Sequence, residues 1–120
     1  MNERLRFITH QGKQILLVDV SHCNPAMVEK VLREVPDVVA KQPRGSVLIL
    51  TDFRASTFDA EAMRVMKESA VFDKPYVKKS AWVGADSFPE GFAKSLREFS
   101  RRDFGSFNSR EEALEWLANE

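Results

Sequence analysis

The stretch SVLILTDFRASTFDAEAM, residues 46–63, decides the fold of this chain. It starts with a continuous apolar run, Val47 to Leu50, which is typical of a β-strand buried on both faces. A polar turn follows over Thr51 to Thr57, and the residues after the turn have helical spacing. A strand that leads through polar residues into a helix is typical of open α/β sheets, whose sites lie beyond the carboxyl ends of their strands. We therefore expect an α/β fold with a candidate site at this edge.

The turn after the strand supplies the first candidate site residues, which are Asp52, Arg54, Ser56 and Thr57. Asp52 ends the strand, where it would either cap the turn by accepting backbone N–H bonds or act as a general base; turn chemistry favours the cap. Ser56 and Asp59 have the spacing of a capping box with the shorter acid in place of Glu, which predicts Ser56 as the helix N-cap. The turn contains no glycine-rich phosphate loop.

Length, charge and cysteine content set the class of protein. A chain of 120 residues corresponds to one domain, and equal numbers of basic and acidic residues, 18 each, create no field that would attract nucleic acid. Cys23 is the single cysteine, which excludes an internal disulfide and a cysteine-pair metal site. No stretch approaches about 18 consecutive apolar residues, and the N-terminus lacks a signal peptide's apolar core. We expect a cytoplasmic single domain, residues 1–120, with no metal, cofactor or transmembrane segment.

The chain before the central strand predicts a hairpin and a helix. Residues 4–10 alternate between polar and apolar, a turn with Gly12 follows, and residues 15–18 form an apolar run, which indicates two adjacent strands. Asn24 is placed to N-cap a helix with Pro25 at its first position. Pro36 lies within the helical pattern, so we expect a kink there, or a stop and restart.

The chain after the central strand repeats the alternation. A helix that stops before Lys74 and Pro75 is followed by a strand over residues 77–83, a helix with a capping box at Ser87 and Glu90, a short strand over residues 104–107, and a helix capped by Ser109. The resulting order, ββαβαβαβα, predicts a mixed, mostly parallel five-stranded sheet with the helices largely on one face. The other face of such apolar strands needs cover from a chain terminus or a partner, so we expect a homodimer.

The pattern resembles the STAS/SpoIIAA-like superfamily, the anti-sigma-factor-antagonist fold, which is related to CRAL-TRIO-type lipid-binding domains. The matching segments are the opening hairpin, LILTDF with its following helix, PYVKKSAWVG, and FGSFNSREEALEWL at the end of the chain. The family's antagonists carry a phosphorylatable serine in an Asp-Ser-Ser-Gly-Leu turn at a helix start. Ser56 and Thr57 lie at the matching place, without the Gly-Leu pair. The resemblance implies a regulatory module.

Other candidate residues follow the neighbouring strands. Ser21 and His22 precede the first helix and Asp86 follows the fourth strand, so parallel strands would bring them to the same edge as Asp52. His22 beside Cys23 suggests a thiolate–imidazole pair, but a packed or incidental pair is favoured because neighbours in a loop usually point apart.

Two functions from different classes remain. The first is a non-enzymatic regulatory or protein-interaction module, because no complete catalytic constellation is present in the sequence. The alternative is a carrier or sensor for a small apolar ligand such as a lipid, since nine phenylalanines suit an apolar pocket between the helices and the sheet. Nucleic-acid binding is not expected, because acids interleave the basic residues and no aromatic ladder accompanies them.

Overall fold

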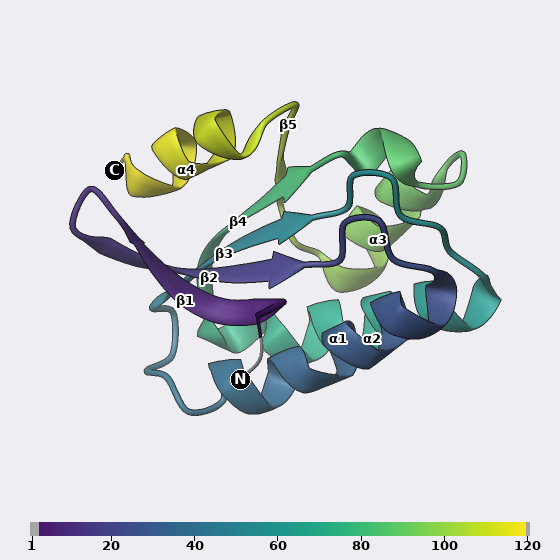
Figure 1. Cartoon of the computed structure of the whole chain (residues 1–120). Helices are drawn as coiled ribbons and strands as arrows, with labels where there is room; N and C mark the ends of the chain where they lie inside the picture. Colours follow the sequence, from purple (N-terminus) through teal and green to yellow (C-terminus); the bar gives the residue numbers. More distant parts are fainter. Residues whose placement is uncertain (1–2, 120) are drawn as a thin grey trace.

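The computed structural model describes residues 3–119, which form one five-stranded sheet with four α-helices (Figure 1). The strands lie in sequential order, and β1 (Leu5–His10) is antiparallel to β2 (Lys13–Asp19). The remaining strands are parallel to β2 and comprise β3 (Val47–Asp52), β4 (Val77–Val83) and β5 (Gly105–Phe107). The predicted α/β class and element order are confirmed.

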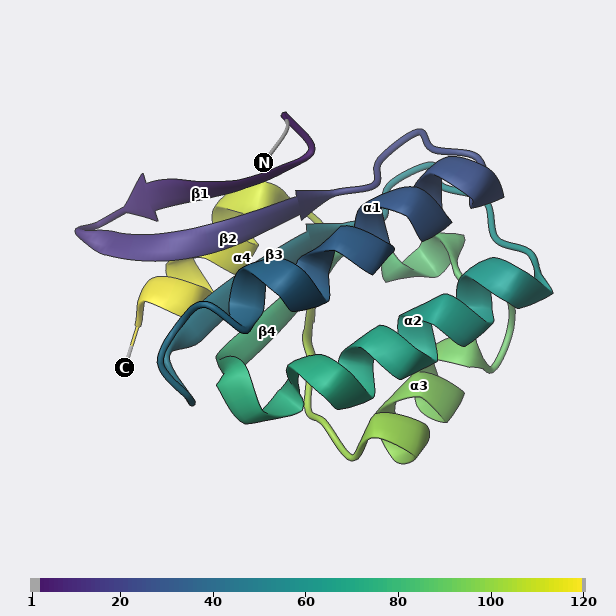
Figure 2. The same ribbon diagram turned by 90° about the horizontal axis from the view of Figure 1, so that it is seen from below.

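Three helices cover one face of the sheet and one covers the other. Figure 2 shows α1 (Pro25–Val39), α2 (Ala60–Asp73) and α3 (Phe92–Ser100) together on one side, with α4 (Arg110–Ala118) behind the strands. The first three helices connect neighbouring parallel strands, and right-handed crossovers place such helices on the same face. No strand follows α4, so no crossover rule fixes its side, and it packs on the face that the others leave open.

The two faces of the strands form two cores. Along β2 and β3, alternate residues point to opposite faces because the side-chain period of a strand is two. The α1–α3 face includes Leu16, Val18 and Ile49, whereas Ile15 and Leu50 pack with α4. The expected homodimer rested on an uncovered second face, and α4 now covers that face. The homodimer therefore stays a prediction, and an uncovered face of the sheet no longer supports it.

Two predicted helix caps are confirmed. The Oδ1 atom of Asn24 accepts a hydrogen bond from the backbone N of Met27 at 2.9 Å, with Pro25 at the first position of α1. The Oγ atom of Ser109 accepts from the backbone N of Glu112 at 3.2 Å. These side chains satisfy N–H groups that the first helical turn leaves unpaired.

The cap predicted at Ser87 is wrong. Ser87 ends a short 3₁₀ helix, η2 (Ala85–Ser87), and α3 starts later with Gly91 as its N-cap. Phe88 between them is extended, because the proline at position 89 disfavours helical backbone in the residue before it. The extended backbone lets Phe88 pack on Phe53, with ring centroids 4.7 Å apart.

Pro36 does not interrupt α1, so the expected stop and restart does not occur. A proline in a helix leaves the carbonyl four residues earlier without its N–H partner. Here that carbonyl belongs to Leu32, and the Oγ atom of Ser69 on α2 lies 3.5 Å from it. The single hydroxyl proton of Ser69 has a nearer acceptor in Asp73 Oδ2 at 3.0 Å, so the Leu32 carbonyl gains little from this contact.

Candidate functional site

The carboxyl edge of the sheet places two acids side by side. Asp19 ends β2 and Asp52 ends β3, and the two are direct partners in the parallel register. By strand alternation both side chains lie on the α4 face, following Leu17 and Leu50. The Asp52 side chain is fully buried, with 0% exposure, whereas that of Asp19 is 23% exposed. Two adjacent carboxylates repel each other unless cations compensate them.

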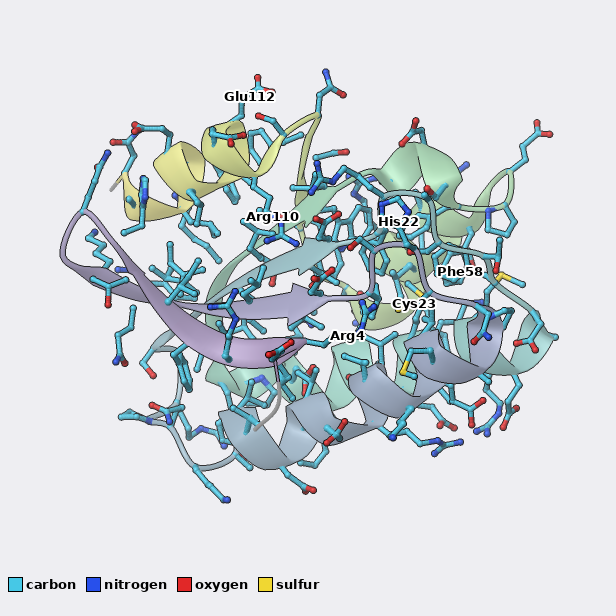
Figure 3. The ribbon with its side chains drawn as sticks, viewed as in Figure 1. Arg4, His22, Cys23, Phe58, Arg110 and Glu112 are labelled. Atoms are coloured by element: carbon cyan, nitrogen blue, oxygen red, sulfur yellow. The ribbon has the colours of Figure 1, made fainter. Side chains whose placement is uncertain are left out.

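Arg110 supplies the shared cation. Its Nε atom lies 2.8 Å from Asp52 Oδ2, and its Nη2 atom lies 3.3 Å from Asp19 Oδ2. Arg110 is the first residue of α4, and Figure 3 shows it over the strand ends. The helix that covers the second core therefore also neutralises the two acids at the edge.

Arg54 completes the coordination of Asp52. The Oδ1 atom of Asp52 accepts from the backbone N of Arg54 at 3.0 Å, and Oδ2 accepts from its Nη2 at 2.7 Å. Asp52 thus caps the turn as predicted and forms an ion pair that the sequence did not indicate. Burial alone would raise the pKa of Asp52, but the hydrogen bonds from Arg54 and Arg110 hold it below its usual value. A carboxylate held this way is a weak base.

The other carboxylate oxygen of Asp19, Oδ1, accepts hydrogen bonds from Ser21. Its Oδ1 accepts from the backbone N of Ser21 at 3.0 Å and from the Ser21 Oγ at 2.6 Å. Burial opposes ionisation, but these two hydrogen bonds lower the pKa of Asp19. Arg4 donates to the Ser21 carbonyl at 3.1 Å and lies 3.8 Å from Asp19 Oδ1. We refer to Arg4, Asp19, Asp52, Arg54 and Arg110 as the edge network.

Glycine at position 84 is required for the position of Arg54. Gly84 has φ +77°, and a Cβ added to it would lie 2.6 Å from Arg54 Cγ and 2.7 Å from its backbone N. The backbone of Arg54 therefore crosses directly over Gly84. A side chain there would displace the turn that carries Asp52's counterion.

Hydrogen bonds also join the two loops at this edge. The backbone N of His22 donates to the Arg54 carbonyl at 2.9 Å, and the backbone N of Thr57 donates to the Cys23 carbonyl at 3.0 Å. The Ser56 hydroxyl donates to the Val20 carbonyl at 2.6 Å and is buried. The loops after β2 and β3 therefore form one bonded unit.

The N-cap predicted at Ser56 is wrong. Because the Ser56 hydroxyl is used between the loops, the cap of α2 is Asp59, whose Oδ1 accepts from the backbone N of Ala62 at 2.8 Å. The sequence pattern assigned Asp59 to the third position of the helix, as the partner of a Ser56 cap. In the structure Asp59 is itself the N-cap.

His22 and Cys23 lack the setting of a reactive pair. His22 is exposed and has a left-handed backbone, with φ 57°, whereas Cys23 is buried. Burial raises the pKa of the Cys23 thiol, which disfavours the thiolate that nucleophilic chemistry needs. Figure 3 labels both residues in the loop after β2. Their arrangement favours the packed or incidental pair.

The remaining predicted residues are at the same edge but are solvent-exposed. Thr57 is exposed in the loop before α2, and Asp86 is exposed in η2, outside the edge network. The structure therefore links Ser21, His22 and the turn of residues 52–57 by hydrogen bonds, and leaves Asp86 at the periphery. Sequence reasoning missed Arg4, Asp19 and Arg110.

Residues 3–119 hold no group of three His, Cys, Asp or Glu side chains that could bind a metal ion. Within the same range, no helix has the length and apolar character needed to cross a membrane. Comparison of the chain with family models, curated proteins and solved structures gave no match. The resemblance to the STAS/SpoIIAA-like superfamily therefore stays a prediction.

Replacing Ser56 with alanine is expected to reduce the free energy of unfolding by about 1 kcal/mol. It removes the shorter of two hydrogen bonds to the buried Val20 carbonyl and leaves the one from the backbone N of Cys23 at 3.3 Å. Urea unfolding would measure the difference. Thr57→Ala is the matched control, since its hydroxyl is exposed and its loss should change stability by less than about 0.5 kcal/mol. Equal effects of the two substitutions would show that the hydroxyl of Ser56 does not hold the loops together.

Proposed function

We propose that this protein is a non-enzymatic regulatory module of STAS-like type that binds another protein. The observation that carries the proposal is an exposed aromatic side chain on the helical layer, that of Phe72 on α2, which is 49% exposed. A single exposed apolar side chain is common on protein surfaces, whereas one that continues into a depression enlarges the apolar surface available to a partner.

Phe72 borders such a depression between α1 and α2. The depression has a volume of about 290 Å³, and we name it the α1–α2 groove; its lining residues are Leu32, Arg33, Pro36, Val65, Glu68, Ser69 and Phe72. The ring of Phe72 stacks on that of Tyr76 with centroids 6.2 Å apart, which orders an aromatic side chain at the groove's end. Ordered aromatic side chains are typical centres of protein interfaces.

The charges beside the groove are already compensated. Arg33 lies 2.9 Å from Glu29, and Glu68 lies 2.7 Å from Arg64. A partner would therefore gain little from adding a charge there, whereas an apolar side chain would be buried against Phe72. The proposed partner is a protein segment that inserts apolar side chains into the α1–α2 groove.

The non-enzymatic part of the proposal is supported by the edge network. Asp52 is paired with two arginines, Ser56 donates to a backbone carbonyl, and the Cys23 thiol is buried. Each of these three groups thus has a structural bond or a protected position. In the same turn, the accessible hydroxyl is that of Thr57 rather than Ser56, so Thr57 is the proposed position for a regulatory phosphate.

The alternative of a lipid carrier finds less support. The cavity between the helices and the sheet has a volume of about 50 Å³. A water molecule needs about 10–15 Å³ of such space, so the cavity holds on the order of four waters. A lipid chain would require the helical layer to move away from the sheet.

Phe72→Glu is expected to weaken binding of the partner at least about tenfold, because loss of a central interface aromatic typically removes more than about 1.4 kcal/mol. The tagged wild-type protein would first be used to isolate binding proteins, and the dissociation constant of each purified pair would then be measured by calorimetry. Far-ultraviolet circular dichroism would check that the variant is folded.

Val71→Glu is the matched control. Val71 is on the same helix with nearly the same exposure, but it does not line the α1–α2 groove. It should leave the dissociation constant within about threefold of wild type, within the roughly 0.5 kcal/mol scatter of surface substitutions. Binding that is unchanged by Phe72→Glu, or that is weakened equally by both variants, would contradict the proposed groove.

A further inference from the structure

The cavity beneath the helices has an apolar wall and a polar end. Its apolar wall includes Ile49, Met66, Trp82 and Leu96, from the sheet and from α2 and α3. Its polar end is formed by Ser69, Asp73, Ser80 and Arg102. This division into an apolar body and a few polar groups is the usual composition of a small-molecule site.

Asp73 has an oxygen without a hydrogen-bond partner. Its residue is 5% exposed, and Oδ1 is buried with no partner, while Oδ2 accepts from the Ser69 Oγ at 3.0 Å. Asp73 is the last residue of α2, where a helix offers carbonyl oxygens rather than N–H donors. An unpaired buried acceptor is unfavourable, so a donor that enters the cavity, from water or from a ligand, would stabilise Oδ1.

Arg102 sets the charge of that molecule. Its guanidinium donates to the Ala70 carbonyl at 3.0 Å and to the Ser80 Oγ, and it lies 4.7 Å from the ring centroid of Phe104. It also attracts the carboxylate of Asp73 electrostatically. The polar end thus already contains one acid and one base, and a charged ligand would disturb that balance.

We propose that this cavity binds a small neutral molecule with a hydroxyl donor and a short apolar tail, with the hydroxyl bonded to Asp73 Oδ1. The volume of about 50 Å³ limits the ligand to about four non-hydrogen atoms, at 10–15 Å³ for each water-sized group. A short-chain alcohol has this size and chemistry. This proposal concerns the cavity and not the α1–α2 groove. Evidence against alcohol binding in the cavity would therefore leave the proposed protein interaction untouched, and the reverse also holds.

Three probes of four non-hydrogen atoms each test the proposal, namely 1-propanol, propylammonium and acetate. Trp82 lines the cavity, so its fluorescence would report entry of a probe, and the second tryptophan would be removed by Trp116→Phe. Trp116 belongs to α4 and packs against Phe107, on the other side of the sheet. We expect a saturable change with 1-propanol at millimolar concentration, and at least tenfold weaker responses to the two charged probes. Even at the ceiling for each atom, a ligand of four heavy atoms would bind with a dissociation constant of about 40 μM, so millimolar concentrations cover the accessible range.

Asp73→Leu should weaken 1-propanol binding at least tenfold, since it removes the acceptor, whereas Asp86→Asn should leave binding unchanged. Ala70→Val offers a second variant, because Ala70 lines the cavity and a larger side chain there would narrow it. A linear, unsaturated response would overturn the proposal, as would equal responses to all three probes. Binding that survives both Asp73→Leu and Ala70→Val would also overturn it, leaving water as the occupant of the cavity.

Discussion

Replacing Asp52 with asparagine is expected to destabilise the fold by about 3 kcal/mol at neutral pH, because a buried charge pair would lose one partner. Asp52 is fully buried and accepts hydrogen bonds from Arg54 and Arg110, and asparagine would present an amide donor to the same two donors. The arginine side chains are 49% and 30% exposed, so water can compensate part of the loss. This places the effect at the lower end for broken buried pairs.

Urea unfolding at several pH values would test this effect. The pKa of Asp52 is lowered in the folded state, so its contribution is present above the unfolded carboxyl pKa of 3.8 and is lost as the pH falls through the folded value. The difference between wild type and Asp52→Asn should therefore shrink in acid. Asp19→Asn is the control within the same network and should cost about 1 kcal/mol, because Asp19 is partly exposed. A smaller effect of Asp52→Asn than of Asp19→Asn would contradict the central position of Asp52.

Replacing Asp73 with asparagine is expected to act in the opposite direction and to stabilise the protein above pH 7. Burial raises the pKa of Asp73 from 3.8 to about 6, against the opposing effects of Ser69 and Arg102. The folded state therefore favours the protonated acid, and stability falls as the pH rises from about 4 to about 6. The pKa difference corresponds to a penalty of up to about 3 kcal/mol for the ionised form, which a neutral amide avoids.

The prediction would be checked by thermal or urea unfolding of both proteins at pH 4.5 and pH 7.5. Asp73→Asn should be more stable than wild type mainly at pH 7.5. Asp86→Asn, at an exposed position, should have the stability of wild type at both pH values. If Asp73→Asn is less stable than wild type at pH 7.5, then attraction to Arg102 outweighs the cost of burying the carboxylate.

Local signals in the sequence were sufficient for most of the fold. The apolar runs in β2 and β3 and the caps at Asn24 and Ser109 predicted their elements, because each depends on residues close in the chain. The errors arose where two local signals competed. At Ser87 the capping-box spacing was outweighed by the proline at position 89, which keeps Phe88 extended and starts α3 later.

The site was predictable only in part. Strand alternation and parallel topology brought the loop after β2 and the turn after β3 to one edge, as expected. The counterion Arg110 was not predictable, because it lies 58 residues from Asp52 and its approach depends on which face α4 covers. The pairing of Asp19 with Asp52 likewise depends on the register between β2 and β3. The apolar runs do not determine which residues of the two strands lie opposite each other.

The most direct test of the proposed protein-interaction function is chemical-shift mapping. The ¹⁵N-labelled protein would be titrated with its purified partner, and the shift of each backbone amide would be followed. Binding at the α1–α2 groove predicts the largest changes at Leu32, Val65 and Phe72, and little change across the edge network. Changes that cluster instead at residues 52–57, or the absence of any saturable change, would contradict the proposed function.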